Sequence, residues 1–171
     1  YIVTLINERK YFTFTPMLHE VATGGLHAQD IIFDFQSFFK NHNFHFIRGH
    51  VSHVDLQQNT VYIGRRAISG DYLVFATGAV TETHGVVGAG AAHELKTIDD
   101  AKEIKQKIIE LIQGPDRTVT ISIIGAGPTG IELAFEIEQF LKELRGFGES
   151  TEYSLRLINH SDHILRNFPT Q

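Results

Sequence analysis

The chain has 171 residues, of which 42% are hydrophobic and 20% charged, a globular composition that excludes intrinsic disorder, a collagen-like structure and a pure coiled coil. The net charge of −5, without a basic run, argues against a duplex nucleic-acid binder. No apolar stretch reaches about 18 residues, so no membrane-spanning segment is expected.

The first elements expected are a strand and a helix. Residues 1–6 form an apolar, β-branched run that predicts a buried parallel strand. A helix is expected to begin near Pro16 and to stop at Gly24, because proline favours the first helical turn and glycine the position after the last. Residues 30–42 carry several apolar side chains and predict a short helix at their end.

A β-hairpin and a further strand are expected next. Residues 44–55 and 60–63 predict two strands on either side of a turn at 56–59, and residues 71–76 predict a third strand. A cluster of aromatic side chains is expected to fill the core behind this hairpin. Its members are Phe33, Phe35, Phe38, Phe39, Phe44 and Phe46.

The segment 79–96 is rich in Gly, Thr and Ala and is expected to be irregular. Thr97 and Asp100 then have the spacing of a capping box, in which each side chain satisfies a free amide at the start of a helix. The apolar stripe that follows predicts a helix that ends at Gly114-Pro115.

The clearest strand is TVTISII at 118–124, which leads directly into GAGPTG at 125–130. An amphipathic helix is expected after this turn, up to Gly146, and a short strand over 154–158. The pattern G-x-G-x-x-G between a strand and a helix is typical of a dinucleotide-binding turn. A plain tight turn between strand and helix is the alternative.

The glycines of this turn have distinct expected roles. Gly125 permits the tight turn, Gly127 lets the backbone approach a pyrophosphate, and Gly130 lets the helix pack against the strand. The next strand ends at Asn159, where an acid would bind the adenosine ribose of NAD. Asn159 can accept one hydroxyl hydrogen bond, but it has no charge that would repel the 2′-phosphate of NADP. No Arg follows at once to bind that phosphate, so NAD is favoured over NADP.

Glu132 is expected in the first turn of the helix after the Gly-rich turn, where the helix dipole stabilises a negative charge. A helix-start acid is its simplest interpretation. His19 and Glu20 are candidates for an acid–base pair by residue type. Adjacent helix residues do not face each other, so the two are not predicted to act as one. Four histidines at 42, 45, 50 and 53 form no convincing ligand set, and no metal site is predicted.

Several segments, in collinear order, resemble type II NADH dehydrogenases, single-chain flavoproteins that pass electrons from NADH to a membrane quinone. The segments that resemble this family are VTLINERKYFTFTPMLHEVATGGL, FIRGHVSHVD, NTVYI, DYLVFATGA, IIGAGPTGIELAFEI and LRLINHSDHIL. The family is part of the FAD-dependent pyridine nucleotide-disulfide oxidoreductase superfamily, and in it an NADH domain is inserted into an FAD domain.

The resemblance implies an α/β fold with parts of two Rossmann-like dinucleotide-binding domains. Residues 1–80 would be a partial FAD-binding domain with a β-hairpin, 81–96 a linker and 97–171 a partial NADH-binding domain. The Gly-rich turn of the FAD domain would then precede Tyr1, and the return strands, the quinone site and an amphipathic membrane anchor would follow Gln171.

The resemblance also implies the residues that bind the cofactors FAD and NADH. Those on the FAD side are Asn7 at the adenosine ribose, Val51 at the adenine, Thr15 and Pro16 near the flavin ring, and the turn Ala76, Thr77 and Gly78 beside FAD. Those on the NADH side are Gly125, Gly127, Thr129, Gly130 and Asn159. Glu132 would be the catalytic residue, near the place where nicotinamide and flavin meet.

The implied reaction transfers a hydride from NADH to the flavin, which hands the electrons to an external acceptor. The sequence contains no cysteine, so a disulfide or sulfide substrate is disfavoured. A membrane quinone is the acceptor that the resemblance implies, with no nucleic acid as partner. Attachment would be peripheral, at the cytoplasmic face of the cell membrane through a C-terminal region absent from this sequence, and a homodimer is allowed.

Two alternatives stay open at this point. The same two-domain fold serves NADH-dependent flavoprotein reductases of ferredoxin-type acceptors. A non-enzymatic dinucleotide-binding module is the other alternative, which Asn159 and the missing first Gly-rich turn support.

Overall fold

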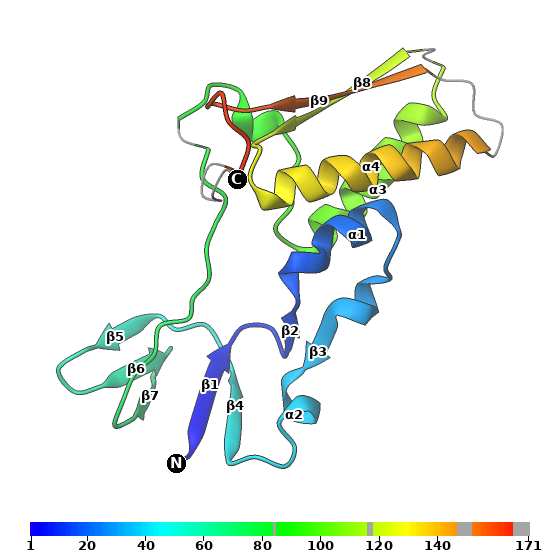
Figure 1. Ribbon diagram of the computed structural model, residues 1–171. Coiled ribbons are helices and arrows are strands. Elements are labelled where there is room, and N and C mark those ends of the chain that lie inside the picture. The colour runs from blue at the N-terminus through cyan, green and yellow to red at the C-terminus, as the bar shows by residue number, and fades with distance from the viewer. Residues whose placement is uncertain (84, 116–117, 147–151, 166–171) are drawn as a thin grey trace. The chain divides into compact units, whose positions relative to one another are not determined.

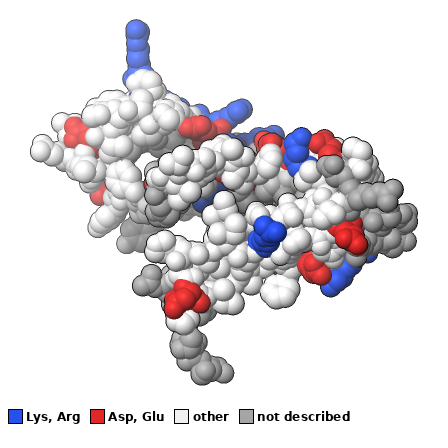
Figure 2. Space-filling view, turned by 90° about the horizontal axis from the view of Figure 1, so that it is seen from above, with Lys and Arg blue, Asp and Glu red and all other residues white. Residues whose placement is uncertain are grey.

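A computed structural model describes residues 1–83, 85–115, 118–146 and 152–165 (Figure 1). The chain divides into two compact units. Unit 1 consists of Tyr1–Thr13 and Ile32–Val80, and unit 2 of Phe14–Ile31 and Thr81–Gln171. Within the described residues, no helix combines the length and apolar character needed to cross a membrane. Acidic and basic side chains are interspersed on the face seen in Figure 2.

Unit 1 contains short strands and one short helix. Its elements are β1 (Val3–Asn7), β2 (Tyr11–Thr13), β3 (Ile32–Asp34), α2 (Phe35–Phe38), β4 (Phe44–Arg48), β5 (His53–Asp55), β6 (Thr60–Ile63) and β7 (Arg66–Ser69). Strands β1 and β4 pair in parallel, β2 and β3 pair antiparallel, and β5, β6 and β7 form an antiparallel sheet. The parallel strand predicted at 1–6 is confirmed as β1, but it is half-buried to exposed rather than buried.

The single strand predicted over 44–55 is wrong, because the structure divides it between two sheets. Gly49 continues the pairing of β4 with β1 by donating its N–H to the carbonyl of Asn7 at 3.0 Å. The backbone N–H of Ser52 instead donates to the carbonyl of Tyr62, at 2.8 Å, so this residue already belongs to the β5–β6 hairpin. A Cβ at Gly49 would lie 2.6 Å from Cγ2 of Ile63, so the crossing between the two sheets needs a residue without a side chain.

The hairpin turn predicted at 56–59 is confirmed. The carboxylate of Asp55 accepts hydrogen bonds from the N–H groups of Gln57 and Gln58, at 2.9 and 3.1 Å. Such side-chain bonds stabilise the backbone where strand pairing stops. Strands β5 and β6 then leave the turn in antiparallel register, with Asp55 opposite Thr60.

The strand predicted over 71–76 is wrong, and sequence patterning missed β7. Strand β7 occupies the edge of β6, with Val61 opposite Ile68. Residues 71–76 pair with no strand among those that the structure describes. Tyr72, Val74 and Phe75 are accordingly 86%, 88% and 60% exposed. Their apolar alternation fits a strand, but a strand also needs a hydrogen-bonded neighbour.

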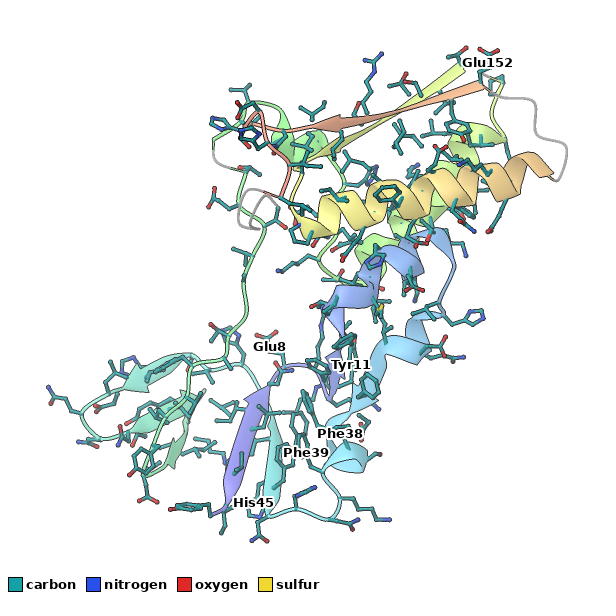
Figure 3. The ribbon with its side chains drawn as sticks, in the orientation of Figure 1. Glu8, Tyr11, Phe38, Phe39, His45 and Glu152 are labelled. Atoms are coloured by element: carbon teal, nitrogen blue, oxygen red, sulfur yellow. The ribbon has the colours of Figure 1, made fainter. Side chains whose placement is uncertain are left out.

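The aromatic cluster of unit 1 forms, although it is not a closed core. The rings of Phe38 and Phe39 meet edge to face with centroids 5.0 Å apart, and Phe39 stacks on Phe44 at 4.2 Å (Figure 3). Phe38 is nevertheless 65% exposed and Phe33 is 41% exposed. The prediction of core residues is therefore wrong for these two.

Asp34 caps α2 by accepting from the N–H of Ser37, which lowers the pKa of this carboxyl.

Unit 2 contains the longer helices and a parallel strand pair. Its described residues form 3₁₀ helices at Thr15–Met17, Ala28–Ile31 and Ala89–Ala91, together with α1 (Leu18–Thr23), α3 (Ile98–Ile112), β8 (Thr118–Ile124), α4 (Pro128–Gly146) and β9 (Glu152–Ile158). Helix α1 ends at Gly24, whose φ of 87° is left-handed, as the sequence predicts. The capping box is also confirmed: Thr97 accepts from the N–H of Asp100 at 3.2 Å and the Asp100 carboxylate from Thr97 at 2.7 Å.

The core of unit 2 lies where the helices pack together and against the strand pair. Figure 1 shows α3 and α4 along one side of β8 and β9, with α1 against the helices. The buried apolar side chains are Leu18, Val21, Ala22, Ile31, Ile98, Ala101, Ile104, Ile108, Ile112, Val119, Ile123, Ala126, Leu133, Ile137 and Leu141. Strands β8 and β9 pair in parallel from Thr118 opposite Glu152 to Ile124 opposite Ile158. Both strands therefore end at the same edge, where the candidate site begins.

Candidate functional site

The Gly-rich turn that joins β8 to α4 forms the centre of the candidate site. Gly125 has a φ of 106°, a left-handed conformation that glycine adopts without strain. Its N–H donates to the carbonyl of Ile158 at 2.8 Å, so the turn is fixed to the end of β9. The predicted order of strand, turn and helix is confirmed by β8 and α4.

The other two glycines meet the steric conditions of a dinucleotide-binding turn. A Cβ added at Gly127 would have nothing within 4 Å, so the backbone there borders open space. A Cβ at Gly130 would lie 2.0 Å from the carbonyl oxygen of Gly125, so only glycine allows this close packing. Thr129 is exposed in the first turn of α4. The open approach and the free amides at the start of this helix fit a pyrophosphate.

Asn159 follows β9 directly and contacts the Gly-rich turn. Its Oδ1 accepts a hydrogen bond from the N–H of Ala126 at 3.3 Å. Its Nδ2 donates to the carbonyls of Ser161 and His163, both at 3.0 Å, and to Oγ of Ser161 at 2.9 Å. The side chain therefore holds the segment after β9 against the turn. The sequence placed Asn159 at this strand end, but these local bonds were not foreseen.

Glu132 is the fifth residue of α4, and the first turn of that helix contains no acidic residue. The prediction that Glu132 lies in the first turn is therefore wrong, because α4 begins at Pro128, before the last glycine of the motif. Its carboxylate Oε2 lies 3.6 Å from Nδ1 of His19 on α1. The sequence did not predict this contact, because the two residues lie on different helices more than a hundred positions apart.

The residues expected on the FAD side lie in both units. Asn7 ends β1, where it is half-buried and donates from Nδ2 to the carbonyl of Arg9 at 3.1 Å. Its own carbonyl accepts from Gly49, on the segment that leads to Val51. Val51 is 36% exposed between β4 and β5. The structure thus brings the strand end with Asn7 close to the chain just before Val51.

The remaining residues expected near FAD are exposed. Ala76, Thr77 and Gly78 follow the unpaired segment of unit 1, and Gly78 has a left-handed φ of 76° with open space around its Cα. Thr15 and Pro16 belong to unit 2, in the 3₁₀ helix that leads directly into α1. The glycine at 78 therefore leaves its backbone accessible, as a close approach to a large cofactor requires.

The chain is similar over its whole length to one protein family. Residues 1–171 match the model of the family described as pyridine nucleotide-disulphide oxidoreductase. The chain is 30% identical to External NADH-ubiquinone oxidoreductase 2, mitochondrial, from Saccharomyces cerevisiae, over 98% of the chain and 35% of that protein. It is also 30% identical to the Type II NADH:quinone oxidoreductase of Staphylococcus haemolyticus, over 83% of the chain and 37% of that protein.

The fold has a close counterpart among solved structures. The structure of NDH2 from Plasmodium falciparum in complex with NADH matches with a TM-score of 0.84 and 25% identity, over 99% of this chain and 39% of that one. The predicted α/β fold with Rossmann-like dinucleotide-binding parts is therefore confirmed, as is the resemblance on which it rested. The chain spans about a third of the length of these relatives.

Proposed function

Because the chain belongs to the pyridine nucleotide-disulphide oxidoreductase family, we propose that the whole protein transfers electrons from NADH through FAD to a quinone. Relatives named as NADH-ubiquinone and type II NADH:quinone oxidoreductases support this choice within the family. In the overall reaction, NADH, a proton and a quinone give NAD⁺ and a quinol.

The observation that carries the proposal is the geometry of the Gly-rich turn. Open space at Gly127, close packing at Gly130 and the left-handed Gly125 together suit a bound pyrophosphate. We assign NADH to this site. The adenosine ribose would lie toward Asn159, at the end of β9.

FAD would be held by the residues of the other predicted site. Asn7, Val51 and the turn at 76–78 would bind it from unit 1, and Thr15 with Pro16 would lie near the flavin ring. The accessible backbone at Gly78 and the contact of Asn7 with the segment before Val51 fit such a role. FAD, when bound, supplies the two-electron redox chemistry, while the protein supplies alignment and electrostatics. The domain bounds 1–80, 81–96 and 97–171 stay part of this proposal.

Glu132 is the residue we assign to the reacting end of NADH. It lies two positions after the last glycine of the motif, and half of its side chain is exposed. A carboxylate there can orient the carboxamide of nicotinamide and can take up or release a proton as the quinone is reduced. Peripheral attachment at the cytoplasmic face of the membrane that holds the quinone, and a homodimer, stay predictions.

An anaerobic NADH titration of the full-length protein, followed by visible absorbance, tests this function. Flavin bands should bleach with NADH and recover when a quinone is added. The Gly127→Val variant should keep its flavin bands unbleached by NADH but bleached by dithionite, because only the NADH site is blocked. Recovery with a ferredoxin but not with a quinone would support the alternative acceptor. Intact protein without flavin bands would leave only a dinucleotide-binding module.

A further inference from the structure

One ionisable pair connects two helices of unit 2. Nδ1 of His19, on α1, lies 3.6 Å from Oε2 of Glu132, on α4. Helices α1 and α4 pack directly against each other (Figure 1). The spacing is that of an ion pair and slightly longer than a hydrogen bond. Hydrogen bonds at active sites are often long before substrate binds and shorten in the complex.

The two partners differ in how firmly they are held. The His19 side chain is only 12% exposed, whereas that of Glu132 is 51% exposed. Helix α1, which carries His19, is anchored by the buried Leu18, Val21 and Ala22. A glutamate that is half exposed has many rotamers of similar energy. A fixed donor beside it selects one orientation of the carboxylate.

The chain around each partner relates the pair to the two predicted cofactor sites. Helix α1 follows the Thr15–Met17 segment without a break, and this segment contains the residues expected beside the flavin ring. Helix α4 begins at the Gly-rich turn that we assign to NADH. The contact between His19 and Glu132 therefore links α1, which follows the segment expected beside the flavin, to α4, which follows the turn assigned to NADH.

We propose that His19 is a positioning residue, whose Nδ1 holds the Glu132 carboxylate in the orientation that the reaction of NADH requires. This inference rests on the function proposed above and adds a residue to it. His19 acts through Glu132 and touches neither reactant. Its role requires a proton on Nδ1, which the neutral imidazole can supply as readily as the charged one.

The position of the donor atom provides a sharp test. The amide nitrogen of asparagine lies about as far along the side chain as Nδ1 of histidine, whereas that of glutamine corresponds to Nε2. In the full-length flavin-loaded protein, His19→Asn should keep kcat within about twofold of the wild type. His19→Gln and His19→Ala should lower kcat about tenfold, the usual effect of losing one hydrogen bond to a charged group. In a Glu132→Gln background, His19→Ala should add less than about twofold, because the partner is already lost.

A second measurement does not depend on turnover. The ¹⁵N chemical shift of His19 Nδ1 should change when Glu132 becomes Gln, since the negative charge 3.6 Å from this nitrogen is removed. The control is His27→Ala, which removes an exposed histidine from the loop after α1 and should change neither kcat nor this shift. Flavin content and the melting temperature identify any variant that fails to fold.

The outcomes separate the inference from the function. Equal losses for Asn, Gln and Ala at position 19, additive losses with Glu132→Gln, or an unchanged Nδ1 shift would each overturn the positioning role while the wild type still reduces quinone. Wild-type protein that binds flavin but passes no electrons from NADH to quinone would overturn the proposed function, and the role of His19 with it.

Discussion

The side-chain oxygen of Asn159 accepts a hydrogen bond from the backbone of Ala126, in the middle of the Gly-rich turn, at 3.3 Å. The same amide group donates to the carbonyls of Ser161 and His163. A neutral amide can both accept from Ala126 and donate to the two carbonyls, whereas a carboxylate accepts but cannot donate. Asn159 therefore orders the backbone around the NADH site that we propose.

Replacing Asn159 with Asp should not improve the binding of NADH, although an acid is the usual partner of the ribose. Asp would keep the acceptor for Ala126 but would set a negative charge beside the carbonyls of Ser161 and His163. We expect a loss of about 0.5–1.5 kcal/mol of stability, the usual contribution of a hydrogen bond, and a higher KM for NADH. Thermal denaturation and steady-state kinetics measure both. Ser161→Ala serves as the control: it removes the hydroxyl that accepts from Asn159 and donates to the carbonyl of His163, and it leaves both backbone carbonyls in place. A lower KM with an unchanged melting temperature would contradict this role of Asn159.

Alanine at Gly130 should affect stability, whereas alanine at Gly127 should affect NADH binding. Gly130→Ala should lower stability by about 1–3 kcal/mol, since its Cβ would meet the carbonyl of Gly125. Gly127→Ala should leave the fold intact, because the space around it is open, and should weaken NADH binding by crowding the pyrophosphate. Urea denaturation and isothermal titration with NADH separate the two effects. The steric assignment fails if Gly130→Ala is as stable as the wild type.

The capping box of α3 should contribute measurably to stability. Thr97→Ala removes the acceptor for the N–H of Asp100 and is expected to cost about 1 kcal/mol. Asp100→Ala should cost a similar amount, and the double variant less than the sum, because both side chains serve one structure. Chemical denaturation measures these differences. Lys102→Ala, an exposed residue of the same helix, is the matched control and should have no more than a slight effect.

The carboxyl of Glu110 should titrate below its ordinary pKa of 4.5. The hydrogen bond from Lys107, at 2.8 Å, is the main cause, and one from Gln106 adds to it. Because the folded-state pKa is lowered, the small stabilisation is present above the unfolded-state value and disappears as the pH falls through the folded one. A carbon-detected NMR titration gives the pKa directly. In Lys107→Met it should move back toward 4.5, and an unchanged pKa in that variant would contradict this cause.

Patterns confined to neighbouring residues predicted most of unit 2 correctly. The capping box at Thr97, the glycine stop at Gly24 and the tight turn at Gly125 each depend on local geometry. The strand predicted after α4 was confirmed as well, although β9 begins at Glu152 rather than at residue 154. Local interactions decide such elements, so the sequence itself contains the required information.

Features that depend on distant partners were harder to predict. Residues 44–55 have one continuous strand-like pattern, yet Gly49 pairs with Asn7 and Ser52 pairs with Tyr62. Which neighbour a strand finds is decided by the whole fold and not by its own residues. The contact of His19 with Glu132 has the same origin, since it depends on how α1 and α4 pack. No spacing rule relates residues on two separate helices.

The segment 71–76 has a consequence for handling the protein. Asp71-Tyr72-Leu73-Val74-Phe75-Ala76 carries a single charge and no proline, and its large apolar side chains at 72, 74 and 75 are exposed. Short segments of this kind, with unpaired backbone, add to one another as cross-β aggregates. We therefore expect the 171 residues alone to self-associate as their concentration rises, with thioflavin-positive material that Val74→Lys suppresses.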